Sequence, residues 1–374
     1  VVSWTALIGG YVQHGFGNEA LKCFKEMKDE GISPNAVTYT CILQACAIVG
    51  CLDIGKDIDV EVRNKGLLQK EIVLGTALVD MYAKCGALVK AREIFEQLPI
   101  RNIVVWNALI TGYVQHGHSN EALKCFKKMK DEKVSANTIT YTSILRACSI
   151  VGSMEIGEGV EAEIRKQGLL QKDILLGTTL VDMYAKCGML EKGREIFKQL
   201  PVQDVVSWTS LMAGYAQLGQ AKRVLELFEE MKEASTMPNT VTFLVLLTTC
   251  SHAGLLEEGQ KLFDDMSRVY GLNPTLEHYT CMIDLFSRAG HFDKAKRLLD
   301  EVPSYDRLTL YLVILGGCRK WVNVELGRWA FEQSLKLDVK CASAYVGMRN
   351  IYSESGMQTE SDKVEALRVQ NEAW

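Results

Sequence analysis

The feature that most constrains the fold is an internal repeat with a period of 102 residues. The stretch Tyr11–Glu30 matches Tyr113–Glu132 at seventeen of its twenty positions. The string VDMYAKCG occurs at Val79–Gly86 and again at Val181–Gly188, and a looser third copy contains IDLFSRAG from Ile283. Repetition at this scale indicates stacked copies of one supersecondary unit, because such a unit buries its apolar face only against its neighbours.

Each period divides into three units of unequal length, and every unit is expected to form two helices joined by a turn. In the first unit Trp4, Leu7 and Tyr11 share one helical face. Asn18 is the expected N-cap of the second helix, and Gly31 is the residue expected to end it. The predicted units are residues 1–35, 36–71, 72–102, 103–137, 138–173, 174–204, 205–239, 240–275 and 276–307.

The predicted fold class is therefore all-α, a right-handed α-solenoid superhelix of stacked helix-turn-helix repeats with one continuous core. An all-α globule with unequal helices is the alternative, and the constant spacing of 102 residues argues against it. No run of about 18 apolar residues occurs, so no membrane span is predicted. The sequence begins inside the repeated pattern, without a targeting segment, so we expect the parent protein to be longer.

Charge and cysteine content bear on the partners and the compartment. The net charge is −4, whereas nucleic-acid binders are more often basic, so RNA binding requires a groove that is locally neutral or basic. The twelve cysteines follow the repeat, as at Cys46, Cys148 and Cys250, and no CxxC pair occurs. We therefore expect buried, reduced cysteines in a reducing compartment rather than disulfides or a metal site.

The first helix of each unit has a second face that differs from an ordinary solvated surface. In the first short unit this face holds Val73, Thr76, Asp80 and Lys84. An aliphatic side chain gives a base a surface to stack on, a hydroxyl or amide reaches its edge, and a cation reaches phosphate. The predicted stacking residues are Val2, Val73, Val104, Leu175 and Val206, and the predicted phosphate contacts are Lys84, Lys186 and Arg288.

An alternative explanation of the same residues needs no ligand. Thr and Asn near helix starts act as caps, and Asp80 with Lys84 forms an ordinary pair four residues apart. For a single unit this explanation is the better one. The recurrence of the same face along the stack favours a strand of RNA, since repeat proteins bind along such surfaces.

Several strings resemble the PLS class of plant pentatricopeptide repeat proteins, whose units alternate in three length classes. They include VVSWTALIGGYVQHG, VDMYAKCG, EIFEQLP and CSHAGLLEEG, and the resemblance extends over residues 1 to about 307. Beyond them, CRKWVNVELG and AYVGMRNIYSESG resemble the paired E motifs of that family, so residues 308–374 are expected to form E1/E2-like helical repeats. Tyr311 and Leu312 stand where that motif usually has Trp-Gly, which makes the tail a degenerate E motif.

The resemblance implies organellar RNA binding, in the mitochondrion or the chloroplast, with one base read by the fifth and last residues of a unit. The family rule assigns adenine to Thr/Asn, guanine to Thr/Asp and a pyrimidine to Asn/Asn. The target implied is 5′-A-n-A-Y-n-G-A-n-?-3′, with the middle unit of each period left unassigned. The residue pairs that carry this reading are Thr5 with Asn35, Thr76 with Asn102, Asn107 with Asn137, Thr178 with Asp204, Thr209 with Asn239, and Thr280 with Asp306 or Arg307.

No catalytic site is predicted, and the chain is not expected to be an enzyme or to hold a cofactor or metal. Cytidine deamination needs an HxE motif, and none of the six histidines is followed by x-Glu. The resemblance, the E-like tail and the missing DYW deaminase domain together suggest a recognition factor for C-to-U editing that receives a deaminase in trans. Other readings are RNA stabilisation, processing or splicing, a protein-binding scaffold like tetratricopeptide repeats, and a non-functional truncated product; no membrane or small-molecule partner is expected.

Overall fold

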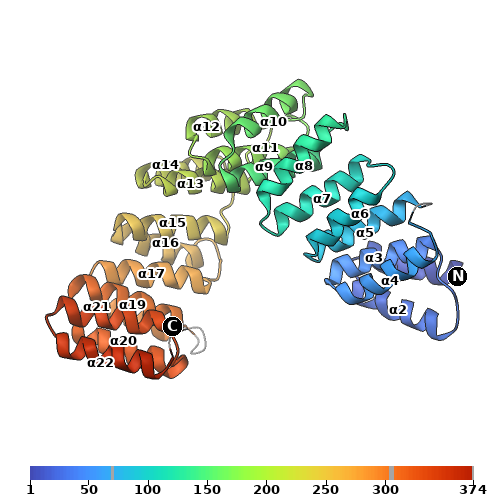
Figure 1. Ribbon diagram of the computed structural model, residues 1–374. Coiled ribbons are helices and arrows are strands. Elements are labelled where there is room, and N and C mark those ends of the chain that lie inside the picture. Colours follow the sequence, from blue (N-terminus) through green and yellow to red (C-terminus); the bar gives the residue numbers. More distant parts are fainter. Residues whose placement is uncertain (69–70, 303–306, 373–374) are drawn as a thin grey trace. The chain divides into compact units, whose positions relative to one another are not determined.

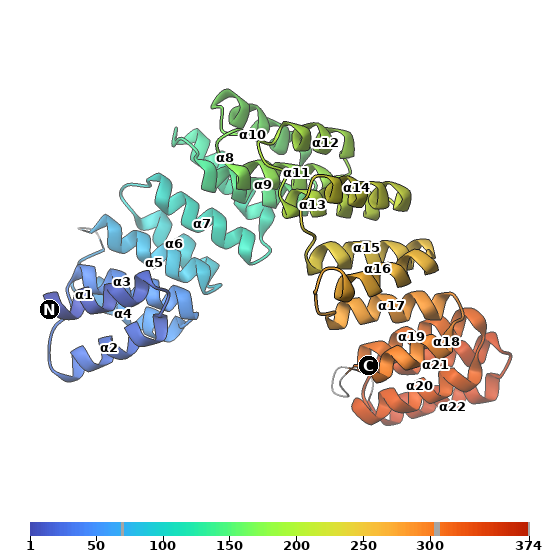
Figure 2. The same cartoon turned by 180° about the vertical axis from the view of Figure 1, so that it is seen from behind.

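The structure, a computed structural model, describes residues 1–68, 71–302 and 307–372. Within these ranges it holds 22 helices and no strand, arranged as consecutive antiparallel hairpins (Figures 1 and 2). The predicted all-α architecture of stacked hairpins is thus confirmed. The chain forms two compact units, residues 1–202 and 203–374, and each is described by itself.

The first unit contains six hairpins. In chain order they are α1 (Val2–Gln13) with α2 (Gly17–Asp29), α3 (Ala36–Val49) with α4 (Leu52–Asn64), α5 (Ile72–Lys84) with α6 (Leu88–Gln97), α7 (Ile103–Gln115) with α8 (Ser119–Asp131), α9 (Thr138–Val151) with α10 (Met154–Lys166), and α11 (Ile174–Lys186) with α12 (Leu190–Gln199). The first helices pack on one another in series, α1 on α3, α3 on α5, α5 on α7, α7 on α9 and α9 on α11.

The second unit contains five hairpins. They are α13 (Val205–Gln217) with α14 (Ala221–Glu233), α15 (Thr240–Ala253) with α16 (Leu256–Arg268), α17 (Leu276–Arg288) with α18 (Phe292–Asp300), α19 (Leu308–Trp321) with α20 (Val324–Leu337), and α21 (Ala342–Glu354) with α22 (Gln358–Gln370). Here too the odd-numbered helices pack in series, from α13 to α21.

The first helix of the middle unit in each period begins and ends at recurring signals. Asn35 caps α3 by accepting a hydrogen bond of 2.8 Å from the main-chain N–H of Thr38, and the Thr38 hydroxyl accepts one in return from the N–H of Asn35. At the other end Gly50 takes a left-handed conformation, with φ of 77°. The same box and the same glycine recur at α9 and α15. These local signals fix where the first helix of each middle unit begins and ends.

The second helix of the first hairpin begins earlier than the sequence analysis predicted. Asn18 lies inside α2, and its N-cap is Phe16, which makes no side-chain capping bond. Gly17 begins the helix because it lies against α3, where an added Cβ would come within 2.5 Å of the Val49 side chain. Close packing, rather than a capping side chain, therefore decides where α2 starts. Gly31 follows α2 in a left-handed conformation, as expected.

The core is continuous through each unit and is built from aromatic and aliphatic side chains of both helices. Tyr39, Trp106 and Tyr184 are fully buried, each in a first helix. Phe95 of α6 meets the Trp106 ring edge-on with 4.5 Å between ring centroids, a contact that stabilises by about 1 kcal/mol beyond area burial. Because this core occupies one side of each first helix, the opposite side is free to form a surface.

Candidate nucleic-acid interface

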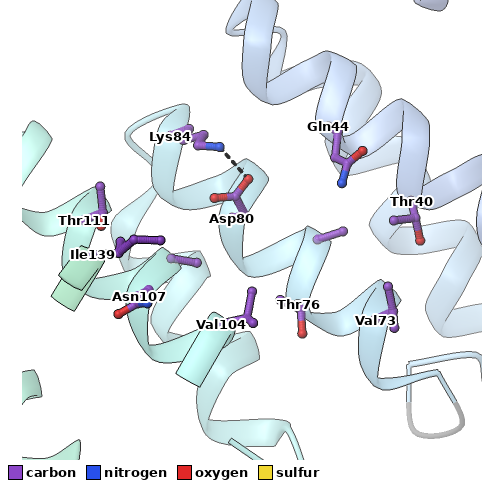
Figure 3. A pocket seen from close by; sticks show the side chains of 12 residues that line it. Thr40, Gln44, Val73, Thr76, Asp80, Lys84, Val104, Asn107, Thr111 and Ile139 are labelled. Atoms are coloured by element: carbon purple, nitrogen blue, oxygen red, sulfur yellow. Dashed lines mark hydrogen bonds and ion pairs between the residues drawn. The ribbon is translucent and has the colours of Figure 1, made fainter. Parts of the chain in front are cut away.

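In the first unit, the faces of α3, α5, α7 and α9 that are opposite the core line one open groove of about 420 Å³. Figure 3 shows the side chains along it, with Val73 and Thr76 on one helix and Val104 and Asn107 on the next. Two successive predicted reading positions therefore lie in the same groove. The remaining lining residues are Thr40, Gln44, Ala77, Asp80, Lys84, Ala108, Thr111 and Ile139.

The predicted stacking residues project from this face into solvent. Val73 and Val104 are 66% and 57% exposed, although both are aliphatic and both line the groove. Large apolar side chains left exposed at a regular interval form a surface on which a flat aromatic ligand can lie. Val2, Leu175 and Val206 are likewise more than half exposed.

The predicted reading residues lie deeper, at the floor between adjacent first helices. Asn107 is buried, and its side-chain N–H group donates a 3.0 Å hydrogen bond to Asn137 Oδ1. Thr140 lies beneath both residues, with its hydroxyl 2.6 Å from Asn107 Oδ1 and 3.0 Å from Asn137 Oδ1. The structure thus brings this fifth and last residue into direct contact.

Two further predicted pairs are linked through a threonine rather than directly. Thr5 Oγ1 lies 2.8 Å from Thr38 Oγ1, which lies 2.9 Å from Asn35 Oδ1. In the second unit Thr209 Oγ1 lies 3.0 Å from Thr242 Oγ1, which again lies 3.0 Å from the capping asparagine, Asn239. Each pair therefore shares one hydrogen-bond network, and Asn35 and Asn239 also cap α3 and α15.

The pairs of the short units are arranged differently. Thr76 donates to the carbonyl of Ile72, Asn102 caps α7, and no hydrogen bond between the two is found in the described part of the chain. Thr280 similarly donates to the carbonyl of its own helix at Leu276. The hydroxyl protons of Thr76 and Thr280 are used within their own helices. Only the oxygen lone pairs of these two residues are left to accept a hydrogen bond from a base.

Other predicted residues fall at the boundaries of the described units. Thr178 is buried in α11 of the first unit, whereas Asp204 belongs to the second unit and caps α13 through the N–H of Ser207, 2.8 Å away. Asp306 lies outside the described residues. Arg307, its alternative, donates 2.7 Å and 3.1 Å hydrogen bonds to main-chain carbonyls of the preceding segment.

The predicted phosphate contacts are all engaged in ion pairs within their own helices. Lys84 Nζ lies 2.8 Å from Asp80 Oδ2, and Lys186 makes the same contact with Asp182. Arg288 Nε lies 2.7 Å from a carboxylate oxygen of Asp284. The alternative of an ordinary surface pair is therefore present in the structure, and the groove around Lys84 is locally neutral. Exposed pairs of this kind contribute at most about 0.5 kcal/mol, so a phosphate can compete for the cation.

The sequence analysis missed Thr38, Thr140 and Thr242, which connect the reading pairs. Each is fully buried and occupies the third position of its helix, so it does not lie on the exposed face that holds the predicted stacking and phosphate contacts. A usable signal was present, because each follows an Asn by three residues, which is the spacing of a capping box.

The cysteines contribute no metal site or disulfide to the described part of the chain. All of them are free thiols there, and no group of three potential ligands is found. Burial raises the pKa of Cys46, Cys148 and Cys250 to about 12, so these thiols stay protonated. The expectation that all would be buried is wrong, since Cys41 and Cys85, among others, are only half-buried. In addition, no described helix is long and apolar enough to cross a membrane.

Fold and groove together define a helical-repeat protein of the α-solenoid class with a polar seam between adjacent first helices. Models of the pentatricopeptide repeat match residues 1–48, 76–103, 101–149, 178–205, 203–252, 241–269 and 277–306. The chain belongs to the pentatricopeptide repeat family.

Known relatives support this assignment over nearly the whole chain. A pentatricopeptide repeat-containing protein of Arabidopsis thaliana is 37% identical over 363 residues, which cover 97% of this chain and 50% of the relative. The chloroplastic protein CRR2 of the same plant is 36% identical, over 97% of this chain and 56% of CRR2. A mitochondrial relative from this plant is 34% identical, over 95% of this chain and 64% of the relative. The chain thus spans half to just under two thirds of the length of these relatives.

Solved structures show the same fold at low sequence identity. The crystal structure of PPR10 in complex with an 18-nucleotide psaJ RNA element matches 99% of this chain and 61% of PPR10, with a TM-score of 0.71 and 19% identity. PPR10 from maize alone matches with a TM-score of 0.60, also at 19% identity. These structures place the chain among the α-solenoids.

Proposed function

We propose that this protein binds single-stranded RNA in a sequence-dependent way. The observation that carries the proposal is the groove in which Val73 and Thr76 of one helix lie beside Val104 and Asn107 of the next. Exposed aliphatic side chains flank a floor of hydroxyl and amide groups, which suits unstacked bases read at their edges. PPR10, which shares the fold, was solved with an RNA element bound.

We further propose that the chain is of the PLS class and serves as a recognition factor for C-to-U editing. The helix lengths support three alternating classes. The second helices α6, α12 and α18 of the short units have 10, 10 and 9 residues, against 13 in the other repeat units. The first helices α3, α9 and α15 have 14 residues, against 12 or 13 in the other repeat units. The hairpins α19–α20 and α21–α22 continue the stack in the E-like region. In this proposal a DYW-type deaminase supplies the catalysis, since the given residues themselves hold no HxE motif.

The organelle in which the protein acts is proposed from the names of its relatives. Some relatives are named mitochondrial and CRR2 is named chloroplastic, so we propose one of these two compartments. Sequencing organellar transcripts of plants that lack the protein tests the editing role. Loss of editing at a site preceded by the implied target supports it, whereas intact editing at every site with altered transcript ends or introns assigns the protein to RNA processing instead.

Binding itself is tested with the purified chain and RNA of the implied sequence 5′-A-n-A-Y-n-G-A-3′. We expect affinity that exceeds that for a scrambled strand and that falls with salt, because phosphate contacts release counterions. A chain with no measurable affinity for any single strand would instead be a protein-binding scaffold.

A single substitution tests base reading at the fourth nucleotide. Asn107→Thr beside Asn137 recreates the hydroxyl–amide arrangement of Thr5 and Asn35, since Thr140 lies where Thr38 does. The preferred base at this position should change from a pyrimidine to adenine, by about tenfold, as for direct readout elsewhere. Competition binding with four RNAs that differ only there measures it, and an unchanged preference contradicts the assignment.

A further inference from the structure

Three buried threonines recur behind the predicted reading pairs, one in each copy of the repeat. Thr38, Thr140 and Thr242 each occupy the third position of a first helix, and none is exposed to solvent. Each hydroxyl contacts both members of a pair, the fifth residue of one hairpin and the last residue before the next. They reach no solvent and so touch no ligand, but they constrain two residues that do.

The hydrogen bonds around Thr140 fix which way the side-chain amides of Asn107 and Asn137 point, because each donor has a limited number of protons. Asn137 Oδ1 accepts from the main-chain N–H of Thr140, which requires oxygen rather than nitrogen at that place, and it also accepts from the Asn107 amide. The one hydroxyl proton of Thr140 is then best used at Asn107 Oδ1, 2.6 Å away. Both amide oxygens are thereby engaged, and the amide nitrogens keep protons that no described protein atom accepts.

Where the fifth residue is threonine, the same assignment of protons leaves a different set of donors and acceptors. In the first copy Thr38 donates to Asn35 Oδ1, so at the 2.8 Å contact Thr5 donates to Thr38 and its own oxygen remains an acceptor. In the third copy Thr209 donates to the carbonyl of Val205, so at the 3.0 Å contact Thr242 donates to Thr209, whose oxygen keeps one lone pair as an acceptor. Beside it, Asn239 Oδ1 accepts from the main-chain N–H of Thr242. These pairs combine an acceptor with an amide donor.

We infer that Thr38, Thr140 and Thr242 are positioning residues that set which pair atoms donate and which accept toward a base. This inference rests on the proposed RNA binding. An acceptor beside a donor matches the N6 amine and N1 of adenine, whereas donors alone match the carbonyl oxygens of a pyrimidine. The base preference of a pair is thus decided partly by a residue of the following hairpin that the base never meets.

The test uses three variants of the full chain, Thr38→Val, Thr140→Val and Thr242→Val. Valine keeps the shape and the bond from its own main-chain N–H to the capping asparagine, but it removes the hydroxyl and with it the return bond from the asparagine N–H. Each change should reduce base discrimination about threefold to tenfold at one nucleotide only, the first, fourth or seventh of the target respectively. Each variant therefore serves as a control for the other two. The hydroxyl-retaining variants Thr38→Ser, Thr140→Ser and Thr242→Ser should restore the wild-type preferences.

A matched control separates this effect from loss of a buried hydrogen bond in general. Thr179 is also buried, and its hydroxyl donates to the carbonyl of Leu175 in its own helix. Thr179→Val should leave discrimination at these three nucleotides unchanged. Thermal unfolding followed by circular dichroism monitors folding, and Thr→Ala replaces Thr→Val at any position where the valine variant does not fold.

The outcomes distinguish this inference from the proposed function. Wild-type protein without any base preference overturns the proposed function. Wild-type protein with preferences that the three valine variants retain overturns the inference alone. Equal weakening at all nucleotides, together with lower stability, also overturns it, because it shows a structural role without an effect on reading.

Discussion

Two residues after the second helix in the first unit of each period, the chain adopts a left-handed conformation, and the three copies fill this position differently. Gly31 has a φ of 72°, whereas Lys133 and Ser235 have φ of 57° and 56°. Only glycine adopts this region without a steric penalty from Cβ. The turn geometry is therefore kept by the hydrogen bonds of the helix end, such as that from the N–H of Lys133 to the carbonyl of Lys130, at 2.9 Å.

Replacing Lys133 by glycine should stabilise the chain. The substitution removes the strain of a left-handed lysine, and the greater freedom of glycine in the unfolded state offsets part of that gain. We expect the free energy of unfolding to rise by about 1 kcal/mol in urea denaturation. Gly31→Lys is the matched reverse change and should lower it by a similar amount. A stability loss for Lys133→Gly contradicts the strain argument.

At the scale of elements, a polar cluster on the second helices joins successive hairpins. Tyr39 of α3 donates a 2.5 Å hydrogen bond to Glu61 of α4, which also accepts from Lys65 at 2.8 Å and from Lys28 of α2 at 3.3 Å. Three helices from two hairpins thus meet at one carboxylate. The second copy repeats the contact with Tyr141, Glu163 and Lys130, while the third copy has Phe243 in place of the tyrosine.

The Glu61 cluster predicts a pH-dependent contribution to stability. Burial alone would raise the pKa of Glu61, but hydrogen bonds from Lys65, Tyr39 and Lys28 outweigh it and lower the pKa to about 2. A lowered pKa in the folded state means that the stabilisation is complete above the ordinary value of about 4.5 and is lost as the pH falls toward 2.

Glu61→Gln should therefore destabilise the chain at pH 7 by about 1 kcal/mol, allowing for solvent screening of a partly exposed group. The difference from wild type should shrink as the pH falls from 5 toward 2, which urea denaturation at several pH values measures. Glu93→Gln, in an exposed pair with Lys90, is the control and should have little effect at any pH. A difference between Glu61→Gln and wild type that does not vary with pH contradicts the lowered pKa.

The sequence predicted helices and their pairing well, because period and apolar spacing determine them. The prediction of helix starts failed where tertiary packing decides them. Asn18 resembles a capping residue but lies inside α2, because Gly17 packs closely against Val49 and begins the helix. For the groove, the sequence located the exposed aliphatic positions, such as Val104, that a helical projection can show. It missed Thr140, whose role depends on a hydrogen bond between hairpins to a residue 33 positions earlier.

At the scale of the whole molecule, net charge opposes RNA binding. The chain carries a charge of −4, and each predicted phosphate contact is paired with a carboxylate on the same helix. Single-stranded RNA is densely negative, so a protein of negative net charge gains little from overall electrostatic attraction. Its affinity for RNA therefore has to come mainly from contacts with the bases. On the proposed function, the recurring aspartates are expected to limit non-specific binding, which favours discrimination over strength.

Removing these aspartates together tests that balance. The triple variant Asp80→Asn, Asp182→Asn and Asp284→Asn frees three cations and raises the net charge from −4 to −1. We expect affinity for a scrambled strand to rise about tenfold at low salt and to fall more steeply with salt, by a slope of up to about −2 for three new phosphate contacts.

A charge-matched control decides whether position or bulk charge is responsible. Asp53, Asp131 and Asp264 are exposed on the second helices α4, α8 and α16, away from the groove, and their replacement by asparagine gives the same net charge. Fluorescence anisotropy with target and scrambled RNA at several salt concentrations compares the two triple variants. If the aspartates paired with the predicted phosphate contacts limit non-specific binding, only the variant of Asp80, Asp182 and Asp284 loses preference for its target, because freed cations attract every strand equally. Equal gains in both variants would show instead that bulk charge controls affinity and that Lys84, Lys186 and Arg288 make no special contact.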